Sequence, residues 1–524
     1  MTVSPPRVFV RGRLYAPTHP GATALVSQGD RIVFVGDDDG ARRWSDGATE
    51  VDLQGRLVTP AFVDAHLHAV QTGLVAAGLD LHDAASRTDV LDRLAAYAAQ
   101  RPAGVIVGQG WDERAWPDPR PPTGPELDRA AGGRLVYLAR VDVHSAVVST
   151  PVLDRLPGVS GTDGFGVDGM LTKEAHHRSR ILVNAMFDDA ERRRAARRAL
   201  RQAVSLGVGS VHELGGPHLG PIEDLNRVRD VGAELGVRVV TYWGEPASQA
   251  AIGRARAFGA VGLAGDLCID GSIGSRTAAL HAPYADAETC GSRYLDDDQI
   301  TEHVIACTRA GLQAGFHCIG DDAVAAAVAG LRRAAERLGV ERVRAARHRL
   351  EHLEMVAADD IPTLAGLGVV ASVQPAFDAL WGRPGELYET RLGSGRAQTM
   401  NPLGSLHRAG VPLAFGTDAP VTPPAGWAMV RAAAEHSRSS ERLGTVEAFA
   451  VATSGGHWAG GIDLAGTLRR GALASFAVWD VRPALPSPAV PDLPDFGSGA
   501  AIPGCVLTVA GGRIAFRLDA EPVG

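Results

Sequence analysis

Lysine is almost absent from this 524-residue chain: of its 52 basic residues, Lys173 is the single lysine and all the others are arginines. Cysteine is scarce too, with five residues and no Cys-x-x-Cys pair. This excludes a structural zinc site built from clustered thiolates and argues against a disulfide framework. Free thiols fit a reducing compartment, so we expect a cytoplasmic protein.

Long apolar runs and extended runs of one charge are also missing. The formal net charge is −8 and no basic stretch stands out, so the sequence predicts no surface for a nucleic acid. The first residues lack the apolar core of a signal peptide, and no segment approaches the roughly 20 apolar residues of a membrane span. We therefore expect a small-molecule substrate, with neither a nucleic acid nor a membrane as partner. A homo-oligomer stays open.

The chain has the composition of a large globular protein, with 45% hydrophobic and 21% charged residues. Its two ends are similar in pattern, because both alternate apolar and polar residues around Gly-containing turns, as β-hairpins do. We expect residues 1–57 and 463–524 to form one composite β-sandwich domain.

Between these ends, short apolar runs alternate with helical segments rich in Ala, Arg and Leu, which is the pattern of βα units on a parallel sheet. Eight such runs predict an α/β fold of the (β/α)₈ barrel type, similar to a TIM barrel, over residues 58–462. The runs are 58–68, 208–214, 237–243, 267–272, 312–319, 348–353, 369–375 and 412–420. The first and second runs are separated by far more chain than a crossover needs, so we expect a large insertion at about 73–185, placed where barrels set substrate specificity.

Chemistry-bearing residues recur at the ends of these runs. His66 and His68 end the first run and, being two apart in a strand, project to the same side. His317, His352 and Asp418 end the fifth, sixth and eighth runs. Because active sites of such barrels form at the carboxyl ends of the strands, these five side chains should meet in one pocket. Imidazoles with a carboxylate favour one or two divalent metal ions, with zinc as the first choice.

The motifs PAFVDAHLH, GFHCIGDDA, HRLEH, GTDAPV and GALASFAVWD, with GWDE in the insertion, resemble the amidohydrolase superfamily and specifically its amidohydrolase family 3 branch. The likeness covers nearly the whole chain. It implies that His66 and His68 bind one metal ion, that His317 and His352 bind a second, and that Asp418 contacts the nucleophilic water.

Many relatives bridge their metals with a carboxylated lysine in a Lys-x-x-x-Asp-Gly pattern, whereas the corresponding run here begins with Asp266 and contains no lysine. The carboxylates that could replace it are Glu174, Asp266, Asp270 and Glu213. Glu174 is slightly favoured, because it matches a family position in the insertion. A carboxylated Lys173 stays open, and so does a site with a single ion.

Further residues are candidates for contacts around the metal site. Trp111, Asp112 and His144 in the insertion match family positions, and Arg276 follows the fourth run, where a guanidinium could bind a substrate carboxylate. Asp321 and Glu351 lie beside the expected ligands and could orient them.

These residues predict a hydrolase that cleaves a non-peptide C–N bond, as in an amide, formamide or cyclic amide, by attack of metal-bound hydroxide. Asp418 would act as the catalytic acid and base. A C–O or ester hydrolase with the same metal site is the first alternative. A catalytically silent barrel that serves as a binding protein is the second.

Overall fold

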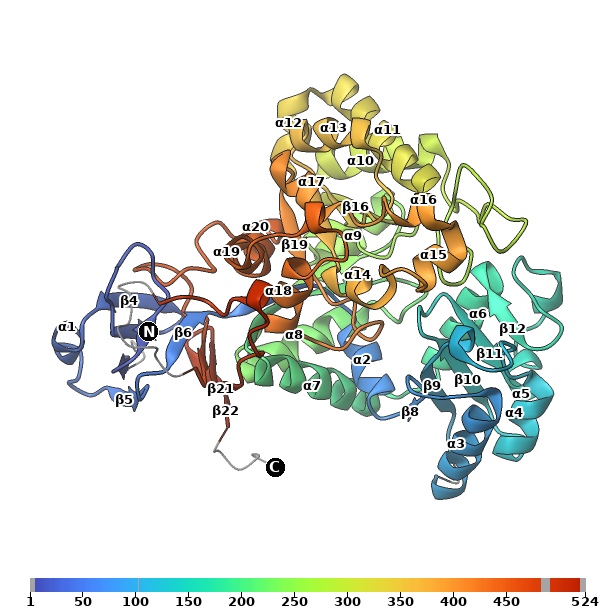
Figure 1. Cartoon of the computed structure of the whole chain (residues 1–524), viewed down its shortest axis with the longest axis horizontal. Coiled ribbons are helices and arrows are strands. Elements are labelled where there is room, and N and C mark those ends of the chain that lie inside the picture. The colour runs from blue at the N-terminus through green and yellow to red at the C-terminus, as the bar shows by residue number, and fades with distance from the viewer. Residues whose placement is uncertain (1–4, 102, 482–490, 519–524) are drawn as a thin grey trace.

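The computed structural model describes residues 5–101, 103–481 and 491–518. At its centre lies a parallel sheet of eight strands in the order β19-β18-β17-β16-β15-β14-β13-β7 (Figure 1). These strands are β7 (Phe62–Leu67), β13 (Val208–Gly215), β14 (Arg238–Trp243), β15 (Gly262–Leu263), β16 (Gln313–Cys318), β17 (Arg349–His352), β18 (Val370–Val373) and β19 (Leu413–Phe415). The predicted (β/α)₈ barrel is confirmed.

The first and last strands of this sheet meet and close the barrel near its carboxyl end. A parallel bridge joins Leu67 to Ala419, and the Asp418 amide donates to the His66 carbonyl at 2.8 Å. Gly416 permits this approach, because a Cβ there would lie 2.5 Å from the backbone nitrogen of His66. Closure therefore brings the chain after β19 directly against the histidines of β7.

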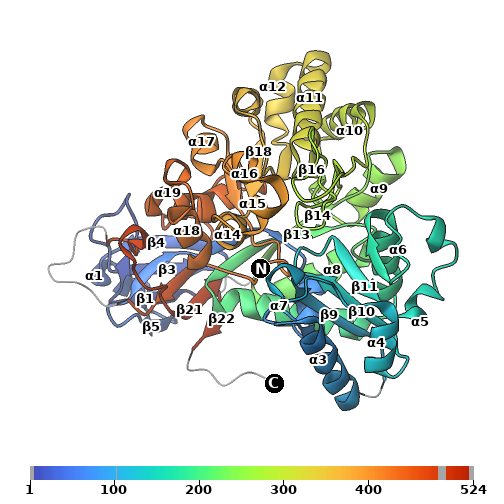
Figure 2. The same ribbon diagram turned by 45° about the vertical axis from the view of Figure 1, so that its right-hand side comes forward.

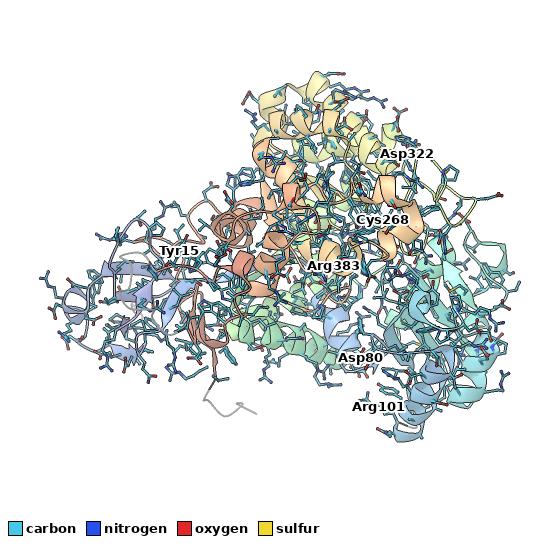
Figure 3. All side chains as sticks on the ribbon, in the orientation of Figure 1. Tyr15, Asp80, Arg101, Cys268, Asp322 and Arg383 are labelled. Carbon is cyan, nitrogen blue, oxygen red and sulfur yellow. The ribbon has the colours of Figure 1, made fainter. Side chains whose placement is uncertain are left out.

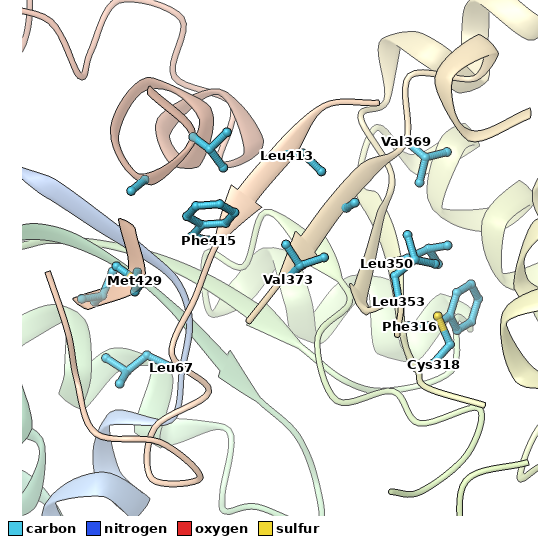
Figure 4. Close-up of a cluster of buried hydrophobic side chains, with 14 of the residues drawn as sticks. Leu67, Phe316, Cys318, Leu350, Leu353, Val369, Val373, Leu413, Phe415 and Met429 are labelled. Atoms are coloured by element: carbon cyan, nitrogen blue, oxygen red, sulfur yellow. The ribbon is translucent and has the colours of Figure 1, made fainter. Parts of the chain in front are cut away.

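Helices pack on the outside of the barrel and bury its apolar surface. They are α7 (Asp189–Ser205), α8 (Glu223–Leu235), α9 (Gln249–Ala257), α10 (Asp297–Ala310), α11 (Asp321–Leu338), α12 (Val340–Ala345), α13 (Ile361–Gly366), α14 (Pro375–Trp381), α15 (Leu387–Leu392), α16 (Ser394–Ala397), α17 (Leu403–Arg408), α18 (Trp427–Ala434), α19 (Thr445–Ala450) and α20 (Gly456–Ala459). Figure 4 shows part of the resulting core, where Phe316, Leu350, Val373 and Phe415 lie on neighbouring strands. Burial of this apolar surface is the main force that holds the barrel together.

Two smaller sheets form the β-sandwich at one end of the molecule. One contains β4 (Arg31–Gly36), β3 (Ala24–Gln28), β1 (Arg7–Val10) and β5 (Thr49–Asp52), with α1 (Asp38–Arg42) beside them. The other combines β2 (Arg13–Leu14) and β6 (Leu57–Pro60) with β20 (Phe476–Trp479), β21 (Cys505–Ala510) and β22 (Arg513–Arg517). Their facing side chains, among them Phe9, Leu25, Phe476 and Val509, share one buried cluster. Strands from both ends of the chain thus lie side by side, blue next to red in Figures 1 and 2.

The insertion leaves the barrel after β7 and α2 (Ala69–Val75) and returns at α7. It forms its own sheet of β12 (Met170–Thr172), β11 (Ser145–Val148), β10 (Val136–Arg140), β9 (Ile106–Trp111) and β8 (Leu79–Asp80), with helices α3 (Arg87–Gln100), α4 (Gly124–Ala131), α5 (Thr150–Leu153) and α6 (Lys173–Asn184). Figure 2 shows this unit beside the barrel, on the side away from the β-sandwich.

The described part of the chain contains neither a membrane-crossing helix nor a disulfide bond. None of its helices combines the length and the apolar character that crossing a membrane requires. Its five cysteines form no disulfide bond, in agreement with their odd number and their spacing.

Candidate metal centre

Six side chains from five strand ends converge at the mouth of the barrel. They are His66 and His68 from β7, Asp266 after β15, His317 from β16, His352 from β17 and Asp418 after β19. Their nitrogen and oxygen atoms form three overlapping groups, in each of which all ligand atoms lie within 4.8 Å of one another. The groups are His66, His352 and Asp418; His66, His68 and Asp266; and Asp266, His317 and His352. The five residues predicted from the strand ends therefore lie together, joined by Asp266.

The two histidines of β7 face the same pair of carboxylates. His66 Nε2 lies 3.2 Å from Asp418 Oδ1 and 3.6 Å from Asp266 Oδ1. His68 Nε2 lies 3.1 Å from Asp418 Oδ1 and 3.4 Å from Asp266 Oδ2. His66 Nε2 is fully buried and has no hydrogen-bond partner among the described residues. A buried nitrogen aimed at carboxylates in this way fits a metal ligand.

Asp266 reaches this position because the chain leaves the sheet for a few residues. The fourth strand, β15, ends at Leu263, and its pairing with β16 resumes at the bridge between Cys268 and His317. In the detour Gly265 has φ +86°, a conformation that glycine adopts without strain. The fourth predicted run, 267–272, thus lies beyond the regular strand, and Asp266 projects from the irregular residues before it.

Two of the converging residues have left-handed backbone conformations. His352 has φ +70° and Asp418 has φ +54°, which non-glycine residues seldom adopt. Strain of this kind persists where the surrounding structure fixes the residue, and it concentrates at functional sites. Here it turns each side chain from the end of its strand into the barrel mouth.

Three of the imidazoles are held by a hydrogen bond from one ring nitrogen to an oxygen outside the cluster. His68 Nδ1 donates to the Leu214 carbonyl at 2.8 Å, and His317 Nε2 donates to the Gly271 carbonyl at 3.1 Å. His352 Nδ1 donates to Gln374 Oε1 at 2.9 Å. Partners of this kind fix the orientation and tautomer of histidine ligands.

His66 is held by an ion pair inside the barrel. Its Nδ1 donates to Glu351 Oε2 at 2.9 Å, and Glu351 is paired through both oxygens with the buried Arg349. Burial would raise the pKa of Glu351, but Arg349 and His66 lower it to about 2, so the carboxylate stays ionised. Glu351 thus orients His66, as the sequence suggested.

Charges within the cluster shift the pKa values of its histidines and carboxylates in opposite directions. Burial would lower the pKa of His66, but Asp418, Asp266 and Glu351 raise it well above its ordinary value. Burial would raise the pKa of Asp418, yet His66, His68 and His352 hold it well below its usual range. The carboxylates around these imidazole nitrogens therefore stabilise positive charge at the cluster, as a cation site requires.

The structure corrects the expected bridge. Glu174 lies in the first turn of α6 with 60% of its side chain exposed, and its nearest ionisable partner is His177 at 4.0 Å. Lys173 pairs with Asp163 at 3.2 Å. Lys173 is partly buried and Glu174 is exposed, and neither belongs to the cluster. Asp266, which occupies the position of the missing lysine, is the carboxylate that does.

The two other candidate bridges have structural partners instead. Asp270 accepts hydrogen bonds from three backbone amides, those of Ala279 at 2.9 Å, Ile319 at 3.0 Å and Gly320 at 2.8 Å. Glu213 accepts from the amide of Ala69 at 2.8 Å. Both carboxylates stabilise loops around the barrel mouth.

Of the predicted substrate contacts, the structure brings one to the pocket. The His144 ring lies 5.0 Å from that of His317 and lines the cavity. Trp111 is buried in the core of the insertion and donates to the Leu138 carbonyl, whereas Arg276 forms two hydrogen bonds with Asp286. The expected contacts of Trp111 and Arg276 with substrate are therefore not supported.

Asp112 and Asp321 have structural partners as well. Asp112 pairs with Arg140 at 2.7 Å, and Asp321 accepts a hydrogen bond from the amide of His281 at 3.0 Å. Neither residue contacts the cluster of histidines and carboxylates.

A pocket opens over the cluster, and its wall contains residues of both the barrel and the insertion. Cys268, one of its lining residues, lies in the middle of the molecule, whereas Asp80 and Arg101 of the insertion lie at the margin (Figure 3). The wall also includes Arg180 of α6, which sequence reasoning missed. Arginine is the ordinary cation of this chain, so nothing in the sequence distinguishes Arg180 from its neighbours.

The sequence is similar to those of known proteins. The chain is 27% identical to the protein LONG AFTER FAR-RED 3 of Arabidopsis thaliana over 442 residues, which cover 77% of this chain and 73% of that protein. It is 24% identical to the putative amidohydrolase YtcJ of Bacillus subtilis, over 76% of this chain and 79% of that protein.

Solved structures share the fold. An uncharacterized metal-dependent hydrolase from Pyrococcus furiosus matches with a TM-score of 0.70 and 27% identity, over 91% of this chain and 99% of that one. An atrazine chlorohydrolase from Arthrobacter aurescens, complexed with zinc, matches with a TM-score of 0.53 and 16% identity, over 98% and 97% of the two chains. A model of the amidohydrolase family matches residues 49–516. Because this match spans most of the sequence, the chain belongs to the amidohydrolase family.

Proposed function

We propose that the protein is a metal-dependent hydrolase that cleaves a non-peptide C–N bond of a small amide. One observation carries this proposal: four imidazoles and two carboxylates place their ligand atoms within 4.8 Å in overlapping groups under a pocket. Buried groups of this kind are costly unless they are paired or hold a cation.

The donor set fits two divalent ions, with zinc as the first choice. We assign His66 and His68 to one ion and His317 and His352 to the other, with Asp266 shared between the two groups. The orphaned Nε2 of His66 supports this assignment. When bound, such ions activate water and polarise a carbonyl.

Asp418 is the proposed acid and base. Its Oδ1 lies against His66 and His68 and its side chain lines the pocket, where a carboxylate can take a proton from a water molecule at the site. The same carboxyl group then returns this proton to the departing nitrogen, which makes the amine a better leaving group. The pocket above the site holds the substrate and excludes bulk water.

The test uses protein stripped with a chelator and reloaded with zinc, manganese, cobalt or iron. Turnover is measured on formamides, anilides and cyclic amides, with matched esters and lactones beside them. We expect amide hydrolysis that depends on added metal and is lost in His66→Ala/His68→Ala. Turnover of the esters alone would replace the C–N assignment by a C–O one. Bound metal without any turnover would refute the enzymatic proposal.

A further inference from the structure

The pocket contains one permanent side-chain cation among its described lining residues, Arg180 of α6. Arg180, Val183 and Asn184 follow the helical spacing i, i+3, i+4, so they share the face of α6 that lines the pocket. Among the described residues, this half-buried guanidinium forms one hydrogen bond, from Nε to the His218 carbonyl at 3.1 Å. Its two terminal NH₂ groups therefore keep four N–H donors for a ligand.

No described carboxylate lies within ion-pair distance of Arg180. The protein treats its fully buried arginines differently, since each of them pairs with an acid. These are Arg140 with Asp112, Arg192 with Asp224, Arg349 with Glu351 and Arg391 with Asp286. A guanidinium held in a pocket without a counter-charge is favourable when the ligand supplies the anion.

The two acids that line the pocket do not compensate Arg180. Asp266 and Asp418 contact His66 and His68 at 3.1 to 3.6 Å, and both belong to the proposed metal centre. Arg180 is thus the source of positive charge on this wall.

Other polar groups of the wall are already engaged with the protein. The amide nitrogens of Gln71 and Asn184 both donate to the Leu219 carbonyl, at 2.6 and 2.8 Å. The amide nitrogen of Gln109 donates to the Pro420 carbonyl at 2.7 Å. Apart from the ring of His144, the side-chain donors left for an anion on this wall are therefore those of Arg180.

The rest of this wall is apolar. Its apolar side chains come from α2, β9 and α6 and from the segments that follow α6 and β13; they are Leu74, Val75, Val107, Val183, Phe187 and Leu219. Such a surface suits a hydrocarbon group of the substrate, because burial of apolar area stabilises the complex.

We propose that Arg180 binds a carboxylate of the substrate, and that the substrates are small N-acylated amino acids with an apolar side chain. This inference rests on the proposed amide hydrolysis and adds the substrate class. The acyl C–N bond would lie at the metal centre, the carboxylate at the terminal NH₂ groups of Arg180, and the side chain on the apolar wall. Two parallel charge-assisted hydrogen bonds from a guanidinium match a planar carboxylate.

The experiment compares N-acetyl-leucine and N-acetyl-phenylalanine, in both enantiomers, with their uncharged carboxamides. Wild type, Arg180→Gln and Arg180→Lys are loaded with zinc, and their metal content and melting temperatures are measured first. Arg178→Gln is the matched control, because Arg178 lies on the same helix but donates to Thr162 and Pro157, away from the pocket. Binding is measured by calorimetry and turnover as kcat/KM.

We expect wild type to prefer at least one carboxylate over its carboxamide by about tenfold or more. Arg180→Gln should lose about 10- to 100-fold on the carboxylate, with little change on the carboxamide and unchanged metal content. Arg180→Lys should keep part of the preference, and Arg178→Gln all of it. A carboxylate bound only by the metal would keep its affinity in Arg180→Gln, which would overturn the inference. So would a wild-type protein that binds none of the probes or shows no preference.

The two proposals fail in different ways. Calorimetric preference that disappears in Arg180→Gln, without turnover of any amide, would refute the hydrolase and leave the anion site standing. Hydrolysis of amides with equal kcat/KM for charged and uncharged probes would refute the anion site and leave the hydrolase standing.

Discussion

Two arginines, one buried inside the barrel and one in the insertion, differ in how their hydrogen bonds are used. Arg349, inside the barrel, is paired with Glu351, donates to the Ala65 carbonyl at 2.8 Å and to Ser372 Oγ at 2.9 Å, and lies 4.5 Å from the Tyr242 ring. Arg180, on the insertion, has one backbone hydrogen bond and faces the cavity. Arg349, whose hydrogen-bond donors are used within the barrel, supports the acid that holds His66. Arg180 keeps donors that a ligand could use. In the proposed enzyme, the barrel supplies the chemistry and the insertion supplies the selectivity.

The largest expected effect is the loss of kcat when Asp418, at the mouth of the barrel, is replaced. Replacement by Asn keeps an oxygen toward the site but cannot accept a proton as the carboxylate does, so kcat should fall by about 100- to 10,000-fold. KM should change far less, because the lost interaction belongs to the transition state.

The check is kcat of the metal-replete Asp418→Asn enzyme on any amide that wild type hydrolyses. Asp321→Asn is the matched control and should change kcat by less than about threefold, since its carboxylate accepts from a backbone amide outside the cluster. A loss below tenfold in Asp418→Asn would place the base on another residue.

The second largest effect is the loss of folding stability that we expect when Arg349 is replaced. Arg349→Met leaves Glu351 as a buried charge without its cation, and the free energy of unfolding should fall by about 3–5 kcal/mol. The double variant Arg349→Met/Glu351→Leu should recover much of this loss. Urea titration measures both, and an Arg349→Met protein as stable as wild type would contradict the structural role of the pair.

A smaller effect is expected at Gln374, which orients His352. In Gln374→Leu the Nδ1 of His352 loses its acceptor, so metal affinity should fall by about 10- to 100-fold. Stability should change little, because the amide nitrogen of Gln374 is buried without a partner in the described chain. Competition with a chelator measures the affinity, and an unchanged value would show that Gln374 does not position the ligand.

The smallest effect is the stability change in Arg180→Met, the counterpart of Arg349→Met. Because Arg180 has no described acid partner, the free energy of unfolding should change by less than about 1 kcal/mol. A loss as large as that of Arg349→Met would mean that Arg180 supports the fold, and the contrast between barrel and insertion would disappear.

Much of this architecture could be predicted from the sequence, because strand–helix alternation implies a closed barrel and a barrel fixes where strand ends meet. His66, His68, His317, His352 and Asp418 are brought together for that reason. Their roles as ligands and catalyst stay predictions.

The parts that sequence reasoning missed depend on three-dimensional contacts. Glu174 and Asp266 are both carboxylates near family motifs, but the irregular turn at Gly265 directs Asp266 inward and the start of α6 leaves Glu174 in solvent. Arg276 and Arg180 differ in the same way, since Asp286 neutralises Arg276 and no described acid reaches Arg180. Partners decide such roles, and local sequence does not reveal them.

We expect the six converging side chains to hold two divalent ions, with Asp266 shared between them. Metal content per chain, measured by mass spectrometry after zinc loading and gel filtration, tests it most directly in wild type, Asp266→Ala and Glu174→Ala. Wild type and Glu174→Ala should each retain two ions, and folded Asp266→Ala should retain one or none. Two ions in Asp266→Ala, or a loss of metal in Glu174→Ala with Asp266 intact, would contradict the account.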